Sequence, residues 1–200
     1  LFDSELNELS RLQTDLPVYK ITAYNNGAGL LAKENGSWNF YRIQPEKENI
    51  EPILTDIKKR NDEIPLYFDT CEELIVYTEP EGNIVWQKGE KQGEIKDLNR
   101  FLLCSYDSNS FLVLRVINFT FEYCAIEKYD INSGDFSHQR YCFCPSSSHC
   151  CLSPDKNYLI SFKIVNPNGE YSPVIIDLNN PVQKTIKAKN LDFDYCQWIE

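Results

Sequence analysis

The chain has 200 residues, of which 42% are hydrophobic and 13% aromatic, so it can bury a sizeable core and does not have the composition of a disordered segment. Its 30 acidic and 20 basic side chains give a net charge of −10, which repels phosphate and anionic lipid and argues against nucleic-acid binding. The longest apolar runs, such as residues 111–114, are strand-sized, whereas a membrane span needs about 18 apolar residues. We therefore expect a globular domain with no nucleic-acid partner and no membrane insertion.

The chain begins with a predicted amphipathic helix over residues 1–17. Four apolar side chains recur there at helical spacing with polar residues between them: Phe2, Leu6, Leu9 and Leu12. Pro17 ends the pattern, because proline disfavours helical geometry in the residue before it and has no backbone N–H to donate. We expect this helix to cap the first strand unit or to dock on a part of a larger protein.

From Tyr19 onward, short apolar runs separated by turn residues predict strands. The Asn35-Gly36 pair between two such runs is a strong hairpin signal, because both residues accept a positive φ. The strands group into four units of four, at about residues 19–56, 66–99, 100–144 and 149–189, and residues 191–200 have the pattern of the first strand of a further unit. The charged segment Asp56–Glu63, the longest connection between units, predicts a solvated loop or one helical turn.

A bulky residue followed by a polar one recurs along the chain. The copies start at residues 41, 86, 129 and 176, so they are 45, 43 and 47 residues apart; they are Tyr41-Arg42-Ile43, Trp86-Gln87-Lys88, Tyr129-Asp130-Ile131 and Ile176-Asp177-Leu178. A period of about 40 to 45 residues with several short strands is typical of a β-propeller blade. The sequence therefore predicts an all-β fold, a β-propeller or partial propeller of about four four-stranded antiparallel blades. The aromatic side chains of Tyr41, Trp86 and Tyr129 are expected to fill the gaps between adjacent blades.

Three strings resemble parts of WD-repeat blades. Residues 152–160, beginning Leu152-Ser153-Pro154-Asp155, are similar to the turn between the two inner strands, while residues 174–180 and 129–134 resemble the third strand and its exit turn. The Gly-His pair of strict WD-repeats is absent, so the blades are degenerate. The same strings, with Gln197-Trp198-Ile199-Glu200 at the end, also resemble the propellers that gate dipeptidyl-peptidase and prolyl-oligopeptidase enzymes.

The sequence leaves the size of the ring open. Four units and one strand can form a small closed ring or a segment of a larger one with about six to eight blades. The incomplete fifth unit and the lack of any methionine, including at position 1, favour a segment of a larger protein.

No catalytic motif is present. The chain has no Gly-x-Ser-x-Gly elbow and no phosphate-binding glycine pattern, and its only histidines are His138 and His149. Cys142 or Cys144 could act as a nucleophile beside one of these histidines. A catalytic thiol needs a base and an orienting group held in a cleft, and nothing in the linear sequence supports that geometry. We therefore expect no catalytic residue and no cofactor.

One cluster offers soft metal ligands, namely Cys142, Cys144, His149, Cys150 and Cys151. One residue separates the first pair and none the last, whereas a zinc knuckle places two residues between paired cysteines. Alternation along a strand would also point Cys150 and Cys151 to opposite faces. The expectation is therefore ordinary packing without a metal, with Cys142, Cys144, His149 and Cys150 as the remaining metal candidates and a local disulfide as the alternative.

Eight cysteines allow two cellular locations. An even count and two glycosylation-type triplets, at Asn35 and Asn118, would suit a secreted, disulfide-bonded protein. Against this, four cysteines lie where a blade would place a small buried residue, and a free cysteine packs as a small hydrophobe; they are Cys71, Cys104, Cys151 and Cys196. We expect a reduced, cytoplasmic protein, with a secreted one as the alternative.

Three hypotheses for function follow. The first is a non-enzymatic interaction or scaffold module that offers its rim and inter-blade grooves to protein partners. The second is a substrate-gating propeller of a serine peptidase whose catalytic domain lies outside this chain. The third is an extracellular recognition domain with disulfides. The sequence does not predict the oligomeric state.

Overall fold

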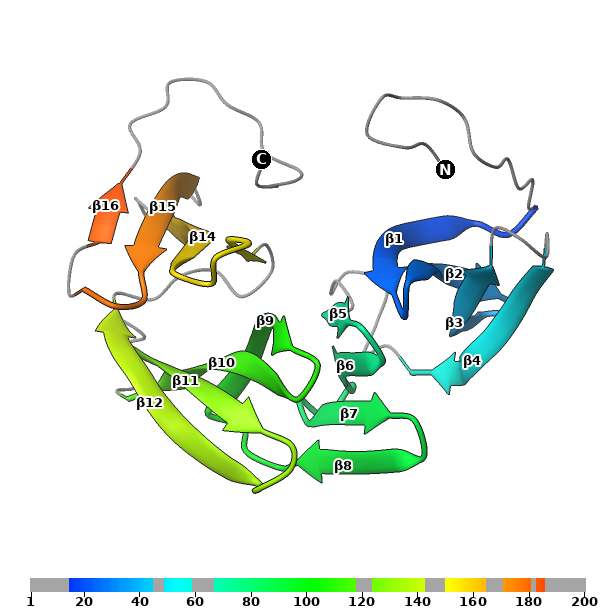
Figure 1. The fold of residues 1–200 in the computed structure, drawn as a ribbon, viewed down its shortest axis with the longest axis horizontal. Helices are drawn as coiled ribbons and strands as arrows, with labels where there is room; N and C mark the ends of the chain where they lie inside the picture. Colours follow the sequence, from blue (N-terminus) through cyan, green and yellow to red (C-terminus); the bar gives the residue numbers. More distant parts are fainter. Residues whose placement is uncertain are drawn as a thin grey trace.

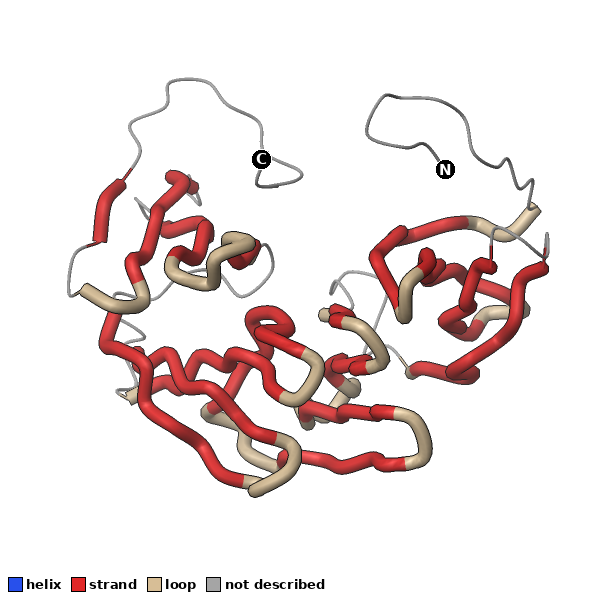
Figure 2. The backbone as a smooth tube through the Cα atoms, in the orientation of Figure 1, coloured by secondary structure: helices blue, strands red, loops and turns tan. Residues whose placement is uncertain are grey.

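The computed structural model describes residues 15–44, 49–58, 67–117, 124–142, 150–164, 171–180 and 183–185. All regular secondary structure in this part of the chain is β-strand (Figure 2). The helix expected over residues 1–17 falls on residues 1–14, which are not described, and on residues 15–17, which are not helical. Among the described residues no helix could cross a membrane.

Four antiparallel sheets of four strands follow one another along the chain, and in each sheet the strands pair in sequence order. Figure 1 shows the four sheets as successive blades of an arc. The first blade consists of β1 (Val18–Tyr24), β2 (Gly27–Glu34), β3 (Ser37–Gln44) and β4 (Asn49–Ile57), and the second of β5 (Phe68–Cys71), β6 (Leu74–Thr78), β7 (Ile84–Lys88) and β8 (Lys91–Ile95). The third contains β9 (Arg100–Asp107), β10 (Ser110–Val116), β11 (Cys124–Asp130) and β12 (Asp135–Cys142), and the fourth β13 (Cys151–Leu152), β14 (Tyr158–Ile164), β15 (Tyr171–Asp177) and β16 (Gln183–Thr185).

Two tight hairpins shape the first blade. Asn35 and Gly36 join β2 to β3 with φ values of 51° and 88°, which confirms the predicted hairpin. Asn25 and Asn26 join β1 to β2 with φ values of 46° and 58°. Positive φ at both central positions twists a two-residue turn in the same sense as the strands that it connects.

The first strand of each blade lies next to the axis of the arc. β1 packs against β5, β5 against β9, and β9 against β13. The later strands of each blade extend outward, so that β4, β8 and β12 lie toward the rim (Figure 1). This is the β-propeller arrangement, in which neighbouring blades cover the faces that a lone sheet would expose.

Apolar layers fill the space between successive blades. Phe40 of the first blade lies against Phe68 of the second, with ring centroids 4.9 Å apart. Trp86 of the second blade and Phe111 of the third belong to the next layer, against which Tyr129 packs. The expectation that Trp86 and Tyr129 fill an inter-blade gap is therefore confirmed.

Tyr41 does not lie between two described blades. It packs with Leu30 and Ala32 of its own blade, whereas its neighbour Phe40 faces the second blade. Because successive residues of a strand point to opposite faces, Tyr41 faces away from the second blade. The repeated residues are thus equivalent in position, each in the third strand of its blade, but not in the direction of their side chains.

Asx turns connect strands in the third and fourth blades. Asp130 accepts hydrogen bonds from the backbone N–H groups of Asn132 and Ser133, which lower its pKa. The residue after the aspartate packs between blades in two of these turns. Ile131, after Asp130, and Leu178, after Asp177, are only 9% and 8% exposed and belong to inter-blade layers. Side-chain hydrogen bonds likewise lower the pKa of the Asp155 and Asp177 carboxyls. Asp130, Asp155 and Asp177 are called the Asx-turn aspartates.

The start of the charged segment Asp56–Glu63 differs from the prediction of a loop or helical turn. Asp56 and Ile57 belong to β4, and Ile57 is buried against the second blade. Asp56 accommodates an irregularity in the strand by adopting a φ of 59°, and its carboxylate accepts a hydrogen bond from Ser37. Residues 59–63 lie outside the described part of the chain.

Candidate axial binding site

A pocket of about 680 Å³ lies where the blades converge. Residues of β1, β5, β9 and β13 line it, together with the turn after β13. All four blades therefore contribute to one concavity, and its volume is within the range of about 300 to 1,000 Å³ that is usual for ligand sites. Its wall includes Ile21, whose side chain is 67% exposed.

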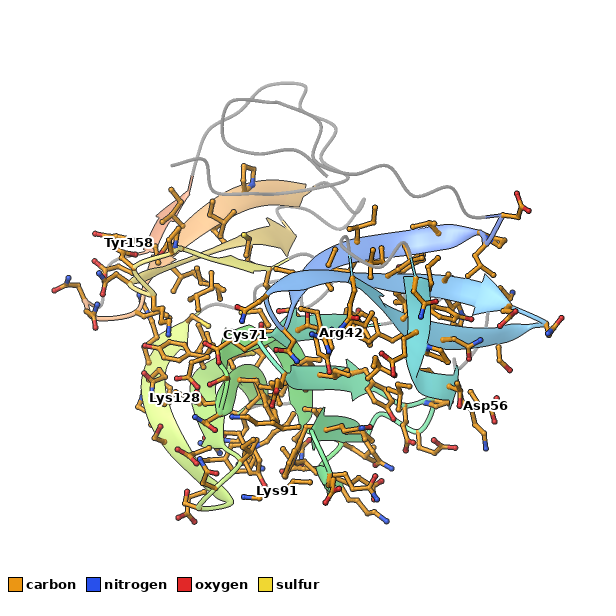
Figure 3. All side chains as sticks on the ribbon, turned by 45° about the vertical axis from the view of Figure 1, so that its right-hand side comes forward. Arg42, Asp56, Cys71, Lys91, Lys128 and Tyr158 are labelled. Atoms are coloured by element: carbon orange, nitrogen blue, oxygen red, sulfur yellow. The ribbon has the colours of Figure 1, made fainter. Side chains whose placement is uncertain are left out.

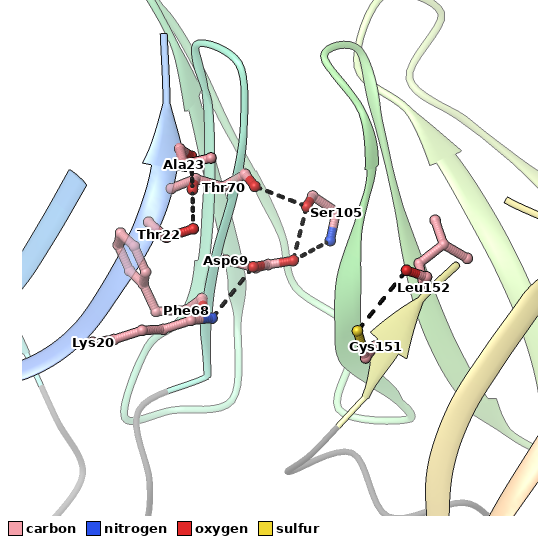
Figure 4. A network of polar contacts seen from close by, with 9 residues as sticks. All are labelled: Lys20, Thr22, Ala23, Phe68, Asp69, Thr70, Ser105, Cys151 and Leu152. Carbon is pink, nitrogen blue, oxygen red and sulfur yellow. Dashed lines mark hydrogen bonds and ion pairs between the residues drawn. The ribbon is translucent and has the colours of Figure 1, made fainter. Parts of the chain in front are cut away.

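Threonines connect the first and second blades at the pocket (Figure 4). The hydroxyl of Thr70 donates to the backbone carbonyl of Ala23 at 2.8 Å. Since that bond uses the only hydroxyl proton of Thr70, the hydroxyl of Thr22 donates to Thr70 Oγ1, also at 2.8 Å.

Asp69 extends this network to three blades. One carboxylate oxygen accepts hydrogen bonds from the backbone N–H and the hydroxyl of Ser105, both at 2.8 Å. The other oxygen lies 3.3 Å from Lys20 Nζ, which also donates to the carbonyl of Phe68 at 2.7 Å. Asp69 thus joins the innermost strands β1, β5 and β9 (Figure 4).

Cysteines form part of the same wall. Burial raises the pKa of the Cys150 thiol to about 12, although the 3.2 Å hydrogen bond between its Sγ and the hydroxyl of Ser161 acts in the opposite direction. Burial also raises the pKa of Cys104 well above its usual value. Because the thiolate is the reactive form, the raised pKa values make these two thiols weaker nucleophiles at neutral pH than an ordinary cysteine.

Tyr106 and Lys156 form another part of the wall, and Lys128 lies near the Tyr106 ring. Lys128 Nζ lies 5.0 Å and Lys156 Nζ 5.2 Å from the centroid of the Tyr106 ring. Tyr106 is the penultimate residue of β9, Lys128 belongs to β11 of the same blade (Figure 3), and Lys156 lies in the turn after β13. Both ammonium groups are within the distance of about 6 Å at which a ring attracts a cation.

The sequence-predicted metal candidates lie partly within the described structure. Cys142 is buried between the third and fourth blades, and Cys150 packs against the same layer. Cys144 and His149 lie outside the described residues. Within the described ranges, no three His, Cys, Asp or Glu side chains form a group that could hold a metal ion.

His138 and Cys142 are not brought together. His138 pairs with Glu127, which faces the second blade together with Val113, whereas Cys142 lies in the layer facing the fourth blade. An irregularity of β12 between these residues changes the alternation, so the two side chains point to opposite faces of the sheet. The structure therefore gives this pair no shared site.

No sequence motif marks the residues of the axial network. Lys20, Asp69 and Ser105 lie in the first strand of three different units, each next to at least one apolar residue. One signal was available: a polar residue recurs in the first strand of every unit, although that strand runs next to the axis.

Comparisons with known proteins address the fold. No protein-family model and no curated protein matches the chain. Among solved structures, TolB from Acinetobacter baumannii is similar over 96% of this chain and 49% of its own, with 12% identity and a TM-score of 0.65. An oligogalacturonate lyase in complex with manganese is similar over 89% and 55%, with 9% identity and a TM-score of 0.58.

A structure of a nidogen/laminin complex matches over 86% of this chain and 64% of its own, with 8% identity and a TM-score of 0.55. The chain therefore spans less than two-thirds of each of these structures. At such identities the similarity concerns the fold and not the activity. The four stacked sheets and these similarities show that the chain is built as a β-propeller with four described blades.

Proposed function

We propose that this chain is a non-enzymatic interaction module that binds a segment of a protein partner in the axial pocket. The observation that carries the proposal is the convergence of all four blades on one pocket that combines hydrogen-bonding groups with an exposed apolar side chain, Ile21. A concave site that mixes apolar surface with a few fixed polar groups is the usual form of a binding site.

The polar network supports binding rather than chemistry. Asp69 and Ser105 satisfy each other, and Lys20 is held by Asp69 and a backbone carbonyl. The thiols of Cys104 and Cys150 are protonated at neutral pH. These groups fix the innermost strands in place, and a rigid wall lowers the entropic cost of ordering a bound peptide.

Peptide selection with two matched variants tests the proposal. A random-peptide display library is selected against the protein, and the affinity of each enriched peptide is then measured for Ile21→Arg and Leu98→Arg. Ile21 and Leu98 are 67% and 72% exposed, but only Ile21 lines the pocket.

We expect Ile21→Arg to abolish binding of most enriched peptides and Leu98→Arg to leave it unchanged, with both variants retaining the wild-type melting temperature. Equal effects of the two substitutions, or no enrichment at all, would refute an axial binding site.

A further inference from the structure

Two cations near the axial pocket form no ion pair with a carboxylate in the described part of the chain, although Lys128 lies near enough to Asp130 to help lower the pKa of that carboxyl. Lys128 and Lys156 approach the ring of Tyr106 from the third and fourth blades, at 5.0 and 5.2 Å from its centroid. Neither ammonium lies within ion-pair distance of a described carboxylate, whereas Lys20 pairs with Asp69. Lys128, Tyr106 and Lys156 are called here the lysine–tyrosine clamp.

The missing partner is notable because carboxylates are abundant. The chain carries 30 acidic and 20 basic residues. The aspartates nearest in sequence to the clamp, Asp130 and Asp155, accept hydrogen bonds within their own turns, from Asn132 and Ser133 in one case and from Ser153 and Asn157 in the other. Their hydrogen-bonding capacity is thus partly used inside the turn.

The arrangement of the clamp suits an anion. Two ammonium groups within 5.0 and 5.2 Å of one ring centroid repel each other, and an anion bound beside them would offset this repulsion. Contact with the ring face leaves N–H donors of each lysine available, since an ammonium carries three. Lys156 is exposed, and Tyr106 and Lys156 both line the pocket, so an incoming group has access.

We propose that the axial pocket selects an acidic segment of its protein partner, with a carboxylate held by Lys128 and Lys156 over Tyr106 and a neighbouring apolar side chain placed on Ile21. The proposal rests on the proposed function and adds the chemistry of the partner. The positive clamp also gives a strongly acidic protein a local attraction for an acidic peptide that would otherwise be repelled.

The test compares random-peptide selections on three proteins. They are the wild type, the clamp variant Lys128→Gln/Lys156→Gln, and the control Lys91→Gln/Lys96→Gln. The control removes the same charge from the exposed edge of the second blade: Lys91 lies in its outermost strand (Figure 3), and Lys96, whose side chain is 73% exposed, follows that strand.

We expect peptides enriched on the wild type and on the control to carry an excess of Asp and Glu, and that excess to disappear on the clamp variant. An enriched acidic peptide should bind the clamp variant about tenfold more weakly, because each partly exposed charge contact contributes up to about 1 kcal/mol. Lys128→Arg/Lys156→Arg should retain binding, since the charge remains.

The outcomes separate the two proposals. Peptides that are sensitive to Ile21→Arg but show no acidic excess would overturn the acidic selectivity and leave the axial site standing. Equal losses in the clamp variant and the control would also overturn it, because the effect would then come from net charge alone. A selection that yields no peptide sensitive to Ile21→Arg would overturn both.

Discussion

Removal of the Asp69 carboxylate should measure how strongly the axial network holds three blades together. Asp69→Ala deletes two hydrogen bonds from Ser105, both 2.8 Å, and the 3.3 Å contact with Lys20. Hydrogen bonds to a charged group contribute about 1.5 to 3 kcal/mol each. The Asp69 side chain is 25% exposed, so we take the lower end, about 1.5 kcal/mol, for each Ser105 bond.

The contact with Lys20 adds little. Its side chain is 37% exposed, and it keeps the carbonyl of Phe68 as a partner, so this pair contributes a few tenths of a kcal/mol. The expected loss is therefore about 3 kcal/mol, equivalent to a fall of about 6 to 12 °C in melting temperature for a chain of this length.

Urea denaturation followed by circular dichroism gives the free energy of unfolding. The control is Glu73→Ala, because Glu73 is exposed and, among the described residues, accepts one hydrogen bond, from Asn25 at 3.3 Å. We expect a change within about 0.5 kcal/mol. A double-mutant cycle of Asp69→Ala with Ser105→Ala should give a coupling energy of about 1 kcal/mol. If Asp69→Ala is as silent as the control, the network does not hold the blades together.

Three further outcomes follow from the packing and the pKa shifts. A Cβ on Gly93 would lie 2.5 Å from the Trp86 ring, so Gly93→Ala should cost about 1 to 3 kcal/mol, and an additive double variant with Trp86→Leu would contradict the close contact. The pKa values are raised to about 12 for Cys150 and well above 9.0 for Cys104. Alkylation near pH 8, followed by mass spectrometry, should therefore modify both thiols about a hundredfold more slowly in the native than in the urea-unfolded protein. Equal rates in the two states would show that the native thiols are accessible. The Asx-turn aspartates have pKa values below the ordinary 3.8. Their contribution to stability is therefore complete above that pH and is lost as the pH falls through the lower pKa values of the folded state. Replacing all three by Asn should flatten the decline in melting temperature below pH 3.8, and an unchanged decline would show that other groups cause the acid sensitivity.

Local sequence signals predicted the elements of the blades. The Asn35-Gly36 hairpin depends on the φ preferences of two adjacent residues, and the structure has it at that position. The spaced copies at Trp86, Tyr129 and Ile176 all lie in third strands, because each unit repeats the same order of four antiparallel strands. Signals within one blade therefore predicted its strands and turns, and the repetition of those signals at intervals of about one blade predicted the architecture.

The face of each side chain and the axial site required information from beyond one blade. Tyr41 and Trp86 occupy third strands, yet a one-residue difference in register directs Trp86 toward the following blade and Tyr41 away from it. Asp69 contacts Lys20 and Ser105, which are 49 and 36 residues away in sequence. No local pattern encodes such pairs, so the pocket could not be predicted without the arrangement of the blades around their axis.

Hydrogen–deuterium exchange with and without a selected peptide tests the axial site most directly. The innermost strands β1, β5, β9 and β13 line the pocket, whereas β4, β8 and β12 lie toward the rim. We predict that peptide binding slows exchange of backbone amides in the innermost strands and in the turn that holds Lys156, and leaves the rim strands unchanged. Protection confined to β4, β8 or β12 would contradict the account and place the binding surface on the rim.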